Sequence, residues 1–478
     1  MNVKALAIHL GRFRVGVLFQ YAAAASHVVT RFVVDDAFAS NPDQPMVSLS
    51  MLADDAQTQR ALWADVRSPI FNGRYSPENG WLLPAFFQNL LPEGVFRDRV
   101  AELRGCDPKD HFEMLAACGR DLPGDLAAQP VDLTRSALAR YVTQDADALE
   151  MTVTAEPLEE GISLSGVQPK LGVQFESGRY VGRTRLRDAQ IIAKLPVVGQ
   201  PLLPQLEALS LHLAEAAGVA VVQAHLEPLE KLQVEHGYDL GEVEAKTQFL
   251  AVTRYDRDAS SNPAARVHCE DFAQILDVMP EQKNTGGTYL DVANIMMAFP
   301  SLGEPAVHEL LRRLAVNEML GNPDMHLKNI GVIYPDGRTP LLPPAYDIVA
   351  YAAYNKRIGH ALHILPPDRQ SPDRRPPDRR PPDSGRSAAK PKMSAAAAQA
   401  GQAAKPGLSP AVVREFCALL DIAEKPAAAA VRQAVAAAVR QWPAMIHDSG
   451  LTVAQKEKLL AHFLAHPLVA SLMRRRVR

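Results

Sequence analysis

The order of apolar and polar positions predicts a strand-rich first part of the chain. Residues 3–10, 15–21 and 28–34 are short runs with many β-branched side chains, separated by polar breaks. Such runs are typical of strands, and three in succession predict a small sheet.

Helical spacing appears next. Phe86, Phe87, Leu90 and Leu91 have the spacing of a helix that buries one face. We interpret that face as core and not as a binding surface. Similar patterns predict further helices at residues 112–119, 204–218, 268–276, 306–320 and from 409 to the end of the chain.

Residues 162–173 alternate apolar and small side chains around a turn that contains Gly166 and Lys170. This pattern predicts a β-hairpin. Serine and glycine allow the backbone to approach closely, so such a hairpin can lay N–H groups over a phosphate. The segment has neither of the common glycine-rich phosphate patterns, and an ordinary hairpin is the alternative.

Lys194 lies inside an apolar strand, residues 191–195. Burying an ammonium group is costly unless an anion accompanies it. ATP phosphates can supply that anion, and so can Glu207 on the predicted helix that follows. The alternative is a lysine whose amine reaches water from an edge strand.

A polar stretch, residues 321–329, follows an apolar helical run. Pro323 predicts a loop, in which Asp324 and Asn329 can both point inward. Asp347 follows a second short apolar segment. A carboxylate that holds no metal can deprotonate a hydroxyl group, while an asparagine oxygen and a second carboxylate can hold magnesium against phosphates. The alternative is a polar turn after a helix.

Composition excludes several other classes of protein. The chain has 478 residues, 47% of them hydrophobic and 22% charged, which is typical of a soluble globular protein of two or three domains. Its formal net charge of −3 does not indicate a non-specific nucleic-acid binder. The four cysteines form no C-x-x-C pair, and no run of 18 apolar residues occurs. We therefore expect a cytoplasmic protein that does not enter a membrane.

The composition changes after about residue 365. A near-repeat of Pro-Pro-Asp-Arg-Arg is followed by a segment rich in Ala, Gln, Lys and Gly. These residues offer little to bury, so residues 366–408 are predicted to be a disordered insert. A partner-docking loop is the alternative.

Seven segments occur in the order Phe86-Phe87-x-x-Leu90-Leu91-Pro92-Glu93-Gly94, Ser163-x-x-Gly166-x-Gln168-x-Lys170, Ile192-x-Lys194, Arg254-Tyr255-Asp256-Arg257, Glu270-Asp271-Phe272-x-Gln274, Asn322-x-Asp324-x-His326-x-Lys328-Asn329 and Tyr346-Asp347. In these segments and their order the sequence resembles HipA-type serine/threonine kinases, the toxin partners in bacterial toxin–antitoxin pairs. The likeness covers most of residues 1–365 and, more loosely, 408–470.

The resemblance implies an α+β, bilobal protein-kinase-like fold with a small N-terminal β-rich subdomain and a mostly helical C-lobe. The expected division is 1–125 for the N-terminal HipA-like subdomain, 126–255 for the kinase N-lobe with the phosphate loop and ATP lysine, 256–365 for the C-lobe with the catalytic and metal-binding loops, 366–408 for the insert, and 409–478 for the last helices of the C-lobe.

It also implies roles for the matching residues. Asp324 is expected to be the catalytic base, Asn329 and Asp347 the magnesium ligands, and Lys194 the residue that holds the ATP phosphates, with Glu207 as its partner. Ser163 is expected to be autophosphorylated, which would switch the kinase off. The other residues expected to bind ATP are Ser165, Gly166, Val167, Gln168, Pro169 and Lys170 in the phosphate loop, Thr253, Arg254 and Tyr255 between the lobes, and His326 and Lys328.

The implied partners are a helix-turn-helix antitoxin of the HipB type and a protein substrate, for which aminoacyl-tRNA synthetases are the family example. DNA would be reached only through the antitoxin. Two other functions stay open: a regulatory protein that acts with the antitoxin on operator DNA, and a small-molecule kinase, since antibiotic phosphotransferases also place Asp, His and Asn close together in a loop.

Overall fold

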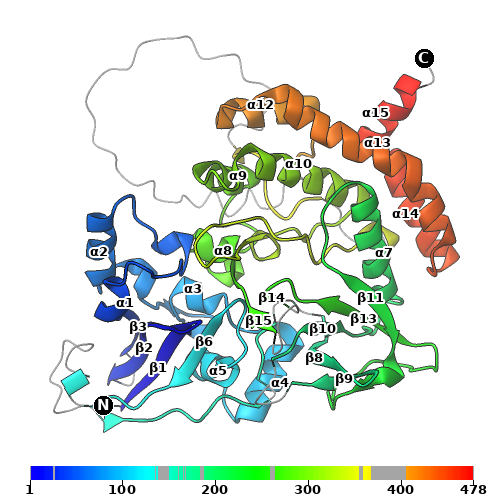
Figure 1. The fold of residues 1–478 in the computed structure, drawn as a ribbon. Helices are drawn as coiled ribbons and strands as arrows, with labels where there is room; N and C mark the ends of the chain where they lie inside the picture. Colours follow the sequence, from blue (N-terminus) through cyan, green and yellow to red (C-terminus); the bar gives the residue numbers. More distant parts are fainter. Residues whose placement is uncertain are drawn as a thin grey trace, which may run out of the picture.

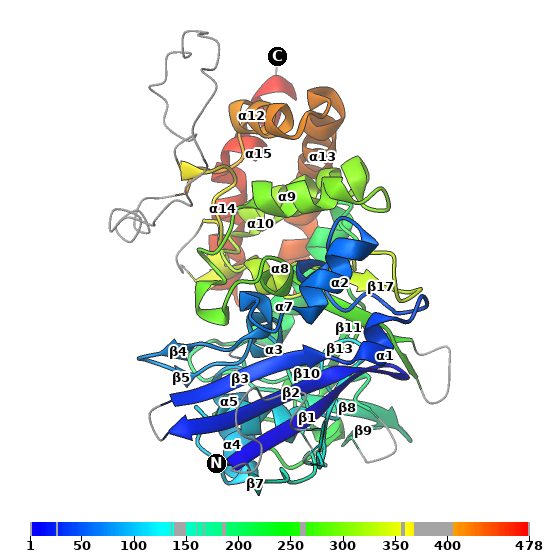
Figure 2. The ribbon, with the colours of Figure 1, turned by 90° about the vertical axis from the view of Figure 1, so that its left-hand side faces the viewer.

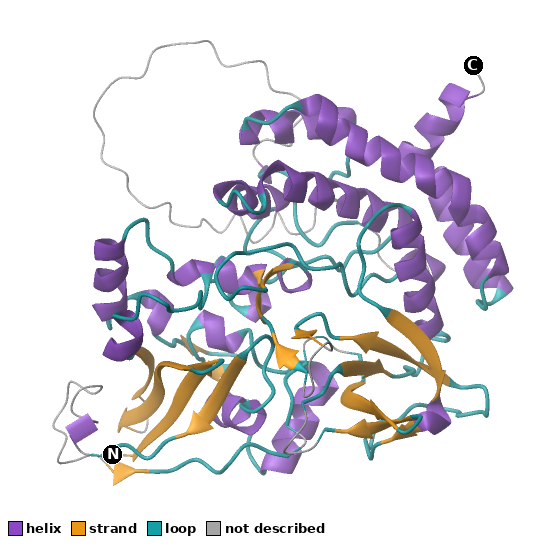
Figure 3. Ribbon diagram, viewed as in Figure 1, coloured by secondary structure: helices purple, strands orange, loops and turns teal. Residues whose placement is uncertain are grey.

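The computed structural model describes residues 2–24, 27–134, 136–137, 150–159, 161–164, 166, 168–183, 188–258, 264–354, 359–367 and 405–476. A strand-rich half and a helical half lie one above the other in Figure 1, and Figure 3 distinguishes them by colour. The predicted α+β class is confirmed.

The first part is a five-stranded sheet with helices packed on one face. Its elements are β1 (Asn2–Leu10), β2 (Phe13–Ala24), β3 (His27–Val34), α1 (Asp36–Ala39), η1 (Leu49–Met51), α2 (Ala56–Ala64), η2 (Pro69–Phe71), β4 (Tyr75–Ser76), β5 (Gly80–Trp81), α3 (Ala85–Gln88), α4 (Gly94–Arg104), α5 (His111–Cys118), β6 (Leu126–Pro130) and β7 (Glu150–Met151).

The three predicted N-terminal strands are confirmed, because β1, β2 and β3 form an antiparallel meander. The sheet order is β3-β2-β1-β6, and β7 also pairs with β1, so the sheet takes in strands beyond residue 125. Figure 2 shows these strands in front of the second sheet. Apolar side chains of β1, β2, α3 and α5 form one shared core.

The second part is a six-stranded sheet of order β11-β13-β10-β8-β9-β12. Its elements are β8 (Lys170–Glu176), β9 (Arg179–Gly182), β10 (Ile191–Lys194), α7 (Leu203–Ala216), β11 (Ala224–Pro228), η4 (Leu229–Lys231), β12 (Leu232–Gln233) and β13 (Gln248–Thr253).

The hairpin predicted at residues 162–173 is wrong. Residues 162–164 belong to no strand, and β8 pairs instead with β10 through Lys170–Val173 and with β9 through Val173–Glu176. Ile162 and Leu164 instead pack into the core of the N-terminal part. The small and apolar alternation there reflects packing against another subdomain and not strand pairing.

The third part is mainly helical. Its elements are β14 (Arg257–Asp258), β15 (Ala265–Arg266), β16 (His268–Asp271), α8 (Phe272–Ile275), η5 (Pro280–Gln282), α9 (Tyr289–Ala298), α10 (Gly303–Leu320), η6 (Leu327–Asn329), β17 (Gly331–Tyr334), η7 (Tyr351–Tyr354), α12 (Pro410–Leu420), α13 (Glu424–Asp448), α14 (Val453–Ala465) and α15 (Pro467–Arg476). Helix α10 lies at the centre of the largest apolar core and packs against α9 and α13.

Two predicted helices are shorter than expected. Helix α3 ends at Gln88, although Leu90 and Leu91 are buried, because the following Pro92 disfavours helical backbone before it. Residues 268–271 form β16, which pairs with β17, and the helix begins only at Phe272. There the Asp271 side chain accepts from the Gln274 backbone N–H, completing a capping box.

Most of the predicted insert lies outside the described residues, so its disorder stays a prediction. In the described part of the chain, no helix combines the length and the apolar character needed to cross a bilayer.

Candidate active site

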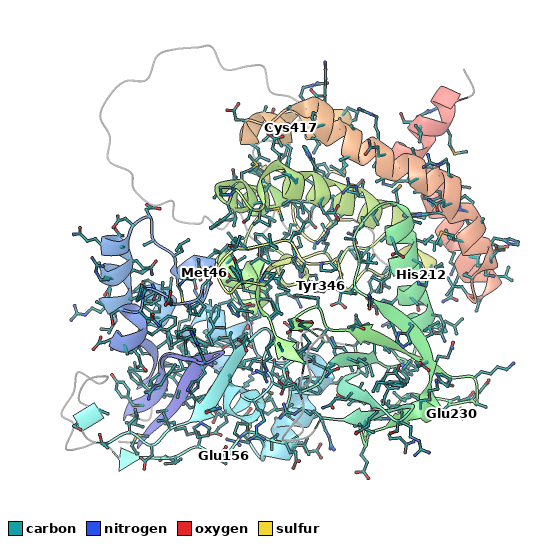
Figure 4. The ribbon with its side chains drawn as sticks, in the orientation of Figure 1. Met46, Glu156, His212, Glu230, Tyr346 and Cys417 are labelled. Carbon is teal, nitrogen blue, oxygen red and sulfur yellow. The ribbon has the colours of Figure 1, made fainter. Side chains whose placement is uncertain are left out.

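One cavity lies between the second sheet and the helical part, and many of the predicted site residues line it. Those residues are Ser163, Lys170, Lys194, Thr253, Arg254, Tyr255, Lys328, Asn329 and Asp347. Tyr346, labelled near the centre of Figure 4, also lines it. The other described candidates lie outside this lining: Gly166, Gln168, Pro169, Glu207, Asp324 and His326.

Lys194 is the last residue of β10, a central strand between β8 and β13. Its buried ammonium donates hydrogen bonds to Glu207 on α7 and to Oδ1 of Asp347. Burial by itself would lower the pKa of Lys194, but the two carboxylates outweigh it and raise this pKa. Lys194 is therefore held as a cation between two elements that are distant in sequence.

The loop that carries Asp324 begins where α10 ends. Gly321 terminates the helix in the left-handed conformation, with φ of 64°, and a Cβ there would come within 2.9 Å of the Ala352 Cβ. The Asn322 side chain then accepts from the Asp324 N–H at 3.1 Å. This local geometry ends the helix and starts the loop that carries Asp324.

Asp324 has a half-exposed side chain (51%) and can meet a substrate. Its partial burial in the cleft, followed by the nearby Asp347 charge, raises the pKa of Asp324 to about 6. A carboxylate with this pKa is deprotonated at neutral pH and can still accept a proton from a hydroxyl group.

Asn329 and Asp347 have oxygen atoms suited to a hard cation. The Asn329 side-chain N–H donates to the Asp324 carbonyl at 2.8 Å, which leaves the amide oxygen as its possible ligand atom. Burial would raise the pKa of Asp347, but Lys194 and Lys170 lower it to about 2, so this side chain is ionised. Asp347 also has a left-handed backbone, with φ of 54°, a strained conformation of the kind found at functional sites.

His326 and Lys328 differ in where their side chains lie. Burial, and then the charge of Lys283, lower the pKa of His326 to about 4, so its ring is neutral. The ammonium of Lys328 turns toward the N-terminal part, where it donates to the Asn89 carbonyl at 2.7 Å and lies 3.2 Å from a Glu93 oxygen. Lys328 lines the cavity, yet its charge is already paired with a protein carboxylate.

The expected phosphate loop is described only in part, because Ser165 and Val167 lie outside the described residues. Gly166 has φ of 95°, which glycine adopts readily. Gln168 donates to the Leu195 carbonyl at 3.1 Å, and the Pro169 carbonyl accepts from the Leu195 N–H at 2.9 Å. Burial lowers the pKa of Lys170 to about 8, although Asp347 acts in the opposite direction.

Ser163 is buried against the N-terminal part. Its hydroxyl donates to the Leu90 carbonyl, and its N–H donates to the Asp121 carbonyl at 3.0 Å. In this conformation the hydroxyl is committed to a protein acceptor, so Ser163 would have to move before it could receive a phosphoryl group.

The segment between the lobes is also partly committed. The N–H groups of Thr253 and Arg254 donate to the carbonyls of Gln223 and Gln190, so an adenine base would have to use other groups there. The Arg254 side chain donates to Asp256 and to the buried carboxylate of Asp121, at 2.9 Å for Asp121.

Two acidic residues that contact the site, Asp121 and Glu93, were not among the site residues predicted from the sequence. Asp121 contacts Arg254 and Arg257, and Glu93 contacts Lys328; in each case the pair lies more than a hundred positions apart in the chain. The sequence signals were weak: an acidic residue after a helix-stopping glycine and a glutamate after Pro92.

A buried ammonium and two oxygen ligands line one cavity, and the half-exposed carboxylate of Asp324 belongs to the same loop as Asn329. This arrangement suits phosphoryl transfer, in which positioning and charge stabilisation supply most of the catalysis.

Comparison with known proteins identifies the family of the chain. The family model described as "HipA-like C-terminal domain" matches residues 162–442, and the one described as "HipA N-terminal domain" matches residues 6–129. The chain belongs to the HipA family.

Relatives within the HipA family agree with this assignment. The protein named "Putative kinase Y4dM", from Sinorhizobium fredii, is 32% identical over 331 residues, which are 68% of this chain and 73% of the relative. The "Serine/threonine-protein kinase toxin HipA" of Shewanella oneidensis is 25% identical over 292 residues, 56% of this chain and 63% of that protein.

A chain in the solved complex of Shewanella oneidensis HipA, HipB and operator DNA has the same fold. Its TM-score is 0.60 at 16% sequence identity, and the match covers 98% of this chain and 97% of that chain. This likeness confirms the predicted kinase-like fold. The domain boundaries and the roles of individual site residues stay predictions.

Proposed function

We propose that this chain is an ATP- and Mg²⁺-dependent protein serine/threonine kinase of the HipA toxin type. The observation that carries the proposal is the convergence of Lys194, Asp324, Asn329 and Asp347 from separate segments around one region of the molecule. Membership of a family whose relatives bear kinase names supports it.

In the proposed reaction, a hydroxyl oxygen of a serine or threonine attacks the γ-phosphorus of ATP. The bond from that phosphorus to the bridging oxygen breaks, ADP leaves, and the hydroxyl proton passes to the Asp324 carboxylate. Lys194 would orient the ATP phosphates. Asn329 and Asp347 would hold magnesium, which neutralises charge on the phosphates.

Two protein ligands suit magnesium, which usually completes its shell with waters and phosphate oxygens. No group of three or more His, Cys, Asp or Glu side chains that could hold a metal occurs in the described part of the chain. Magnesium would compete with Lys194 for Asp347, so we expect the Lys194–Asp347 contact to loosen when ATP and metal bind.

The substrate and the regulation belong to the same proposal. We expect a protein acceptor, with aminoacyl-tRNA synthetases as the first to test, and autophosphorylation at Ser163. Because the Ser163 hydroxyl donates to the Leu90 carbonyl, phosphorylation would require this segment to leave the N-terminal core.

The test is intact-mass measurement of purified protein after incubation with ATP and magnesium, with Asp324→Ala and Asp347→Asn alongside. Phosphate added to the wild type alone, and mapped to a serine or threonine, is the expected result. Protein that arrives unmodified, binds no ATP and gains no phosphate would contradict the proposal.

A second role is compatible with the first. The structural relative was solved with HipB and operator DNA, and we infer that this chain also binds a small helix-turn-helix antitoxin, through which it reaches DNA. Co-expression with a helix-turn-helix protein encoded beside it should yield a complex that survives gel filtration. Separate elution of the two proteins would argue against this partner.

A further inference from the structure

The segment 89–93, between α3 and α4, links the N-terminal part of the chain to the predicted catalytic loop. Lys328 Nζ donates to the Asn89 carbonyl at 2.7 Å, and it lies 3.2 Å from Glu93 Oε1. The other Glu93 oxygen accepts from Lys283 Nζ at 2.9 Å. One carboxylate from the N-terminal part therefore contacts two lysines of the helical part.

The charged groups at this contact are partly or fully buried and stabilise one another. The side chain of Lys328 is 1% exposed, so its charge needs a partner. Burial would raise the pKa of Glu93, but the two lysines lower it to about 2. Glu93 is therefore ionised across the working pH range.

Glu93 does not serve its own helix. It occupies the N-cap position of α4, where a side chain usually accepts from the first backbone N–H groups, yet its carboxylate makes no such bond. The carboxylate is directed away from the helix, toward Lys283 and Lys328. A role limited to stabilising α4 would leave this geometry unexplained.

Lys328 belongs to the catalytic loop (residues 321–329), and Lys283 is joined to that loop through its backbone. The Lys283 carbonyl accepts from the Leu327 N–H at 3.2 Å, and the Lys328 carbonyl accepts from the Tyr346 hydroxyl at 3.1 Å. Lys328 directly precedes Asn329, and Tyr346 directly precedes Asp347. A shift of either lysine would thus move the loop and the proposed metal ligands.

We propose that Glu93 is a positioning residue for phosphoryl transfer, holding Lys283 and Lys328 so that the catalytic loop keeps its reactive geometry. This inference rests on the proposed kinase function and deepens it. The N-terminal part would then be a component of the active enzyme and not only an attached module.

The test is Glu93→Gln, which keeps the size of the side chain and removes its charge. The readouts are the rate of phosphate addition at saturating ATP and the ATP concentration that gives half of that rate. We expect the saturated rate to fall about 10- to 100-fold, because small misplacements of catalytic groups are costly. The half-saturating ATP concentration should change less than about threefold, because Glu93 does not line the cavity.

Glu113→Gln is the matched control. Glu113 also lies in the N-terminal part, pairs with two cations, Lys4 at 2.8 Å and Arg104 at 2.9 Å, and has a side chain 16% exposed against 18% for Glu93. We expect it to lower the thermal midpoint by a similar amount and to leave the saturated rate unchanged. Equal rate losses in both variants would show general destabilisation and overturn the inference.

A double variant tests whether Glu93 acts through Lys328. If it does, Glu93→Gln combined with Lys328→Met should lose little more activity than the more impaired single variant. Multiplicative losses would contradict the inference. If the wild type transfers phosphate and Glu93→Gln does so at the same rate, this inference alone is overturned. If the wild type transfers no phosphate, the proposed function is overturned and this inference with it.

Discussion

Replacing Lys194 by methionine should destabilise the fold in a pH-dependent way. Lys194 is the ammonium that Glu207 and Asp347 share. Methionine fills similar space and removes the charge. The side chain of Glu207 is 1% exposed, so it would remain buried beside another carboxylate without its cation.

Removing one partner of a buried ion pair costs about 3–5 kcal/mol. The cost here is limited by protonation, because burial and the Asp347 charge already favour the neutral form of Glu207 and raise its pKa. Without Lys194 this pKa rises further. A carboxyl group whose pKa is raised on folding costs more stability as pH increases, so the loss should be larger at pH 8 than at pH 5.

Thermal unfolding at both pH values checks this reasoning. Lys194→Met should lower the midpoint most at pH 8, and the double variant Lys194→Met, Glu207→Gln should recover much of the loss. Lys231→Met is the control, because Lys231 pairs with Glu227 at 2.7 Å near the surface and its loss should cost at most about 1 kcal/mol. A pH-independent loss, or no recovery in the double variant, would refute the argument.

Substitutions at Asp324, Glu270 and Gly321 test the catalytic base, a buried carboxyl group and the helix end. Asp324→Asn should slow phosphate transfer by about 10²- to 10⁴-fold. The wild-type rate should fall as the pH drops below 6, because the pKa of Asp324 is about 6 and the base must be deprotonated. A rate that does not change from pH 5 to 8 would argue against Asp324 as the base. Burial raises the pKa of Glu270 to about 7, so stability should decrease by about 3 kcal/mol as pH rises from about 4.5 to 7, and Glu270→Gln should weaken that dependence in pH-resolved unfolding curves. Gly321→Ala should lower the free energy of unfolding by more than the about 1 kcal/mol expected for an alanine in the left-handed conformation, because its Cβ would lie 2.9 Å from the Ala352 Cβ. Gly105→Ala is the control: Gly105 has φ of 68° and open space around it, so only the backbone conformation should lower the stability. Equal losses in the thermal midpoint would refute the packing argument.

The sequence predicted those elements whose pattern is local. The strands β1, β2, β3 and β10 and the helix α10 each carry their own apolar period or β-branched run, so their type follows from neighbouring residues. The fold class followed from their order and from the family resemblance. The turn at Gly321 and the loop after it likewise depend on residues that are adjacent in the chain.

Pairing and long-range contacts needed the tertiary structure. Residues 162–164 have the alternation of a strand, but Ile162 and Leu164 pack into the core of the N-terminal part, which lies far away in the sequence. Lys328 was expected to bind ATP, yet its ammonium pairs with Glu93, which lies far away in the sequence. Nothing in the local sequence around either residue indicates this ion pair.

The sequence by itself determined the kind of protein and the chemical groups available to it, because backbone preferences and side-chain types are properties of short segments. The sequence also predicted Glu207 as the partner of Lys194, but only the tertiary structure decided that Asp347 contacts Lys194 as well and that Glu93 contacts Lys283 and Lys328. Electrostatic pairing depends on distance in space, and the folded chain alone sets that distance.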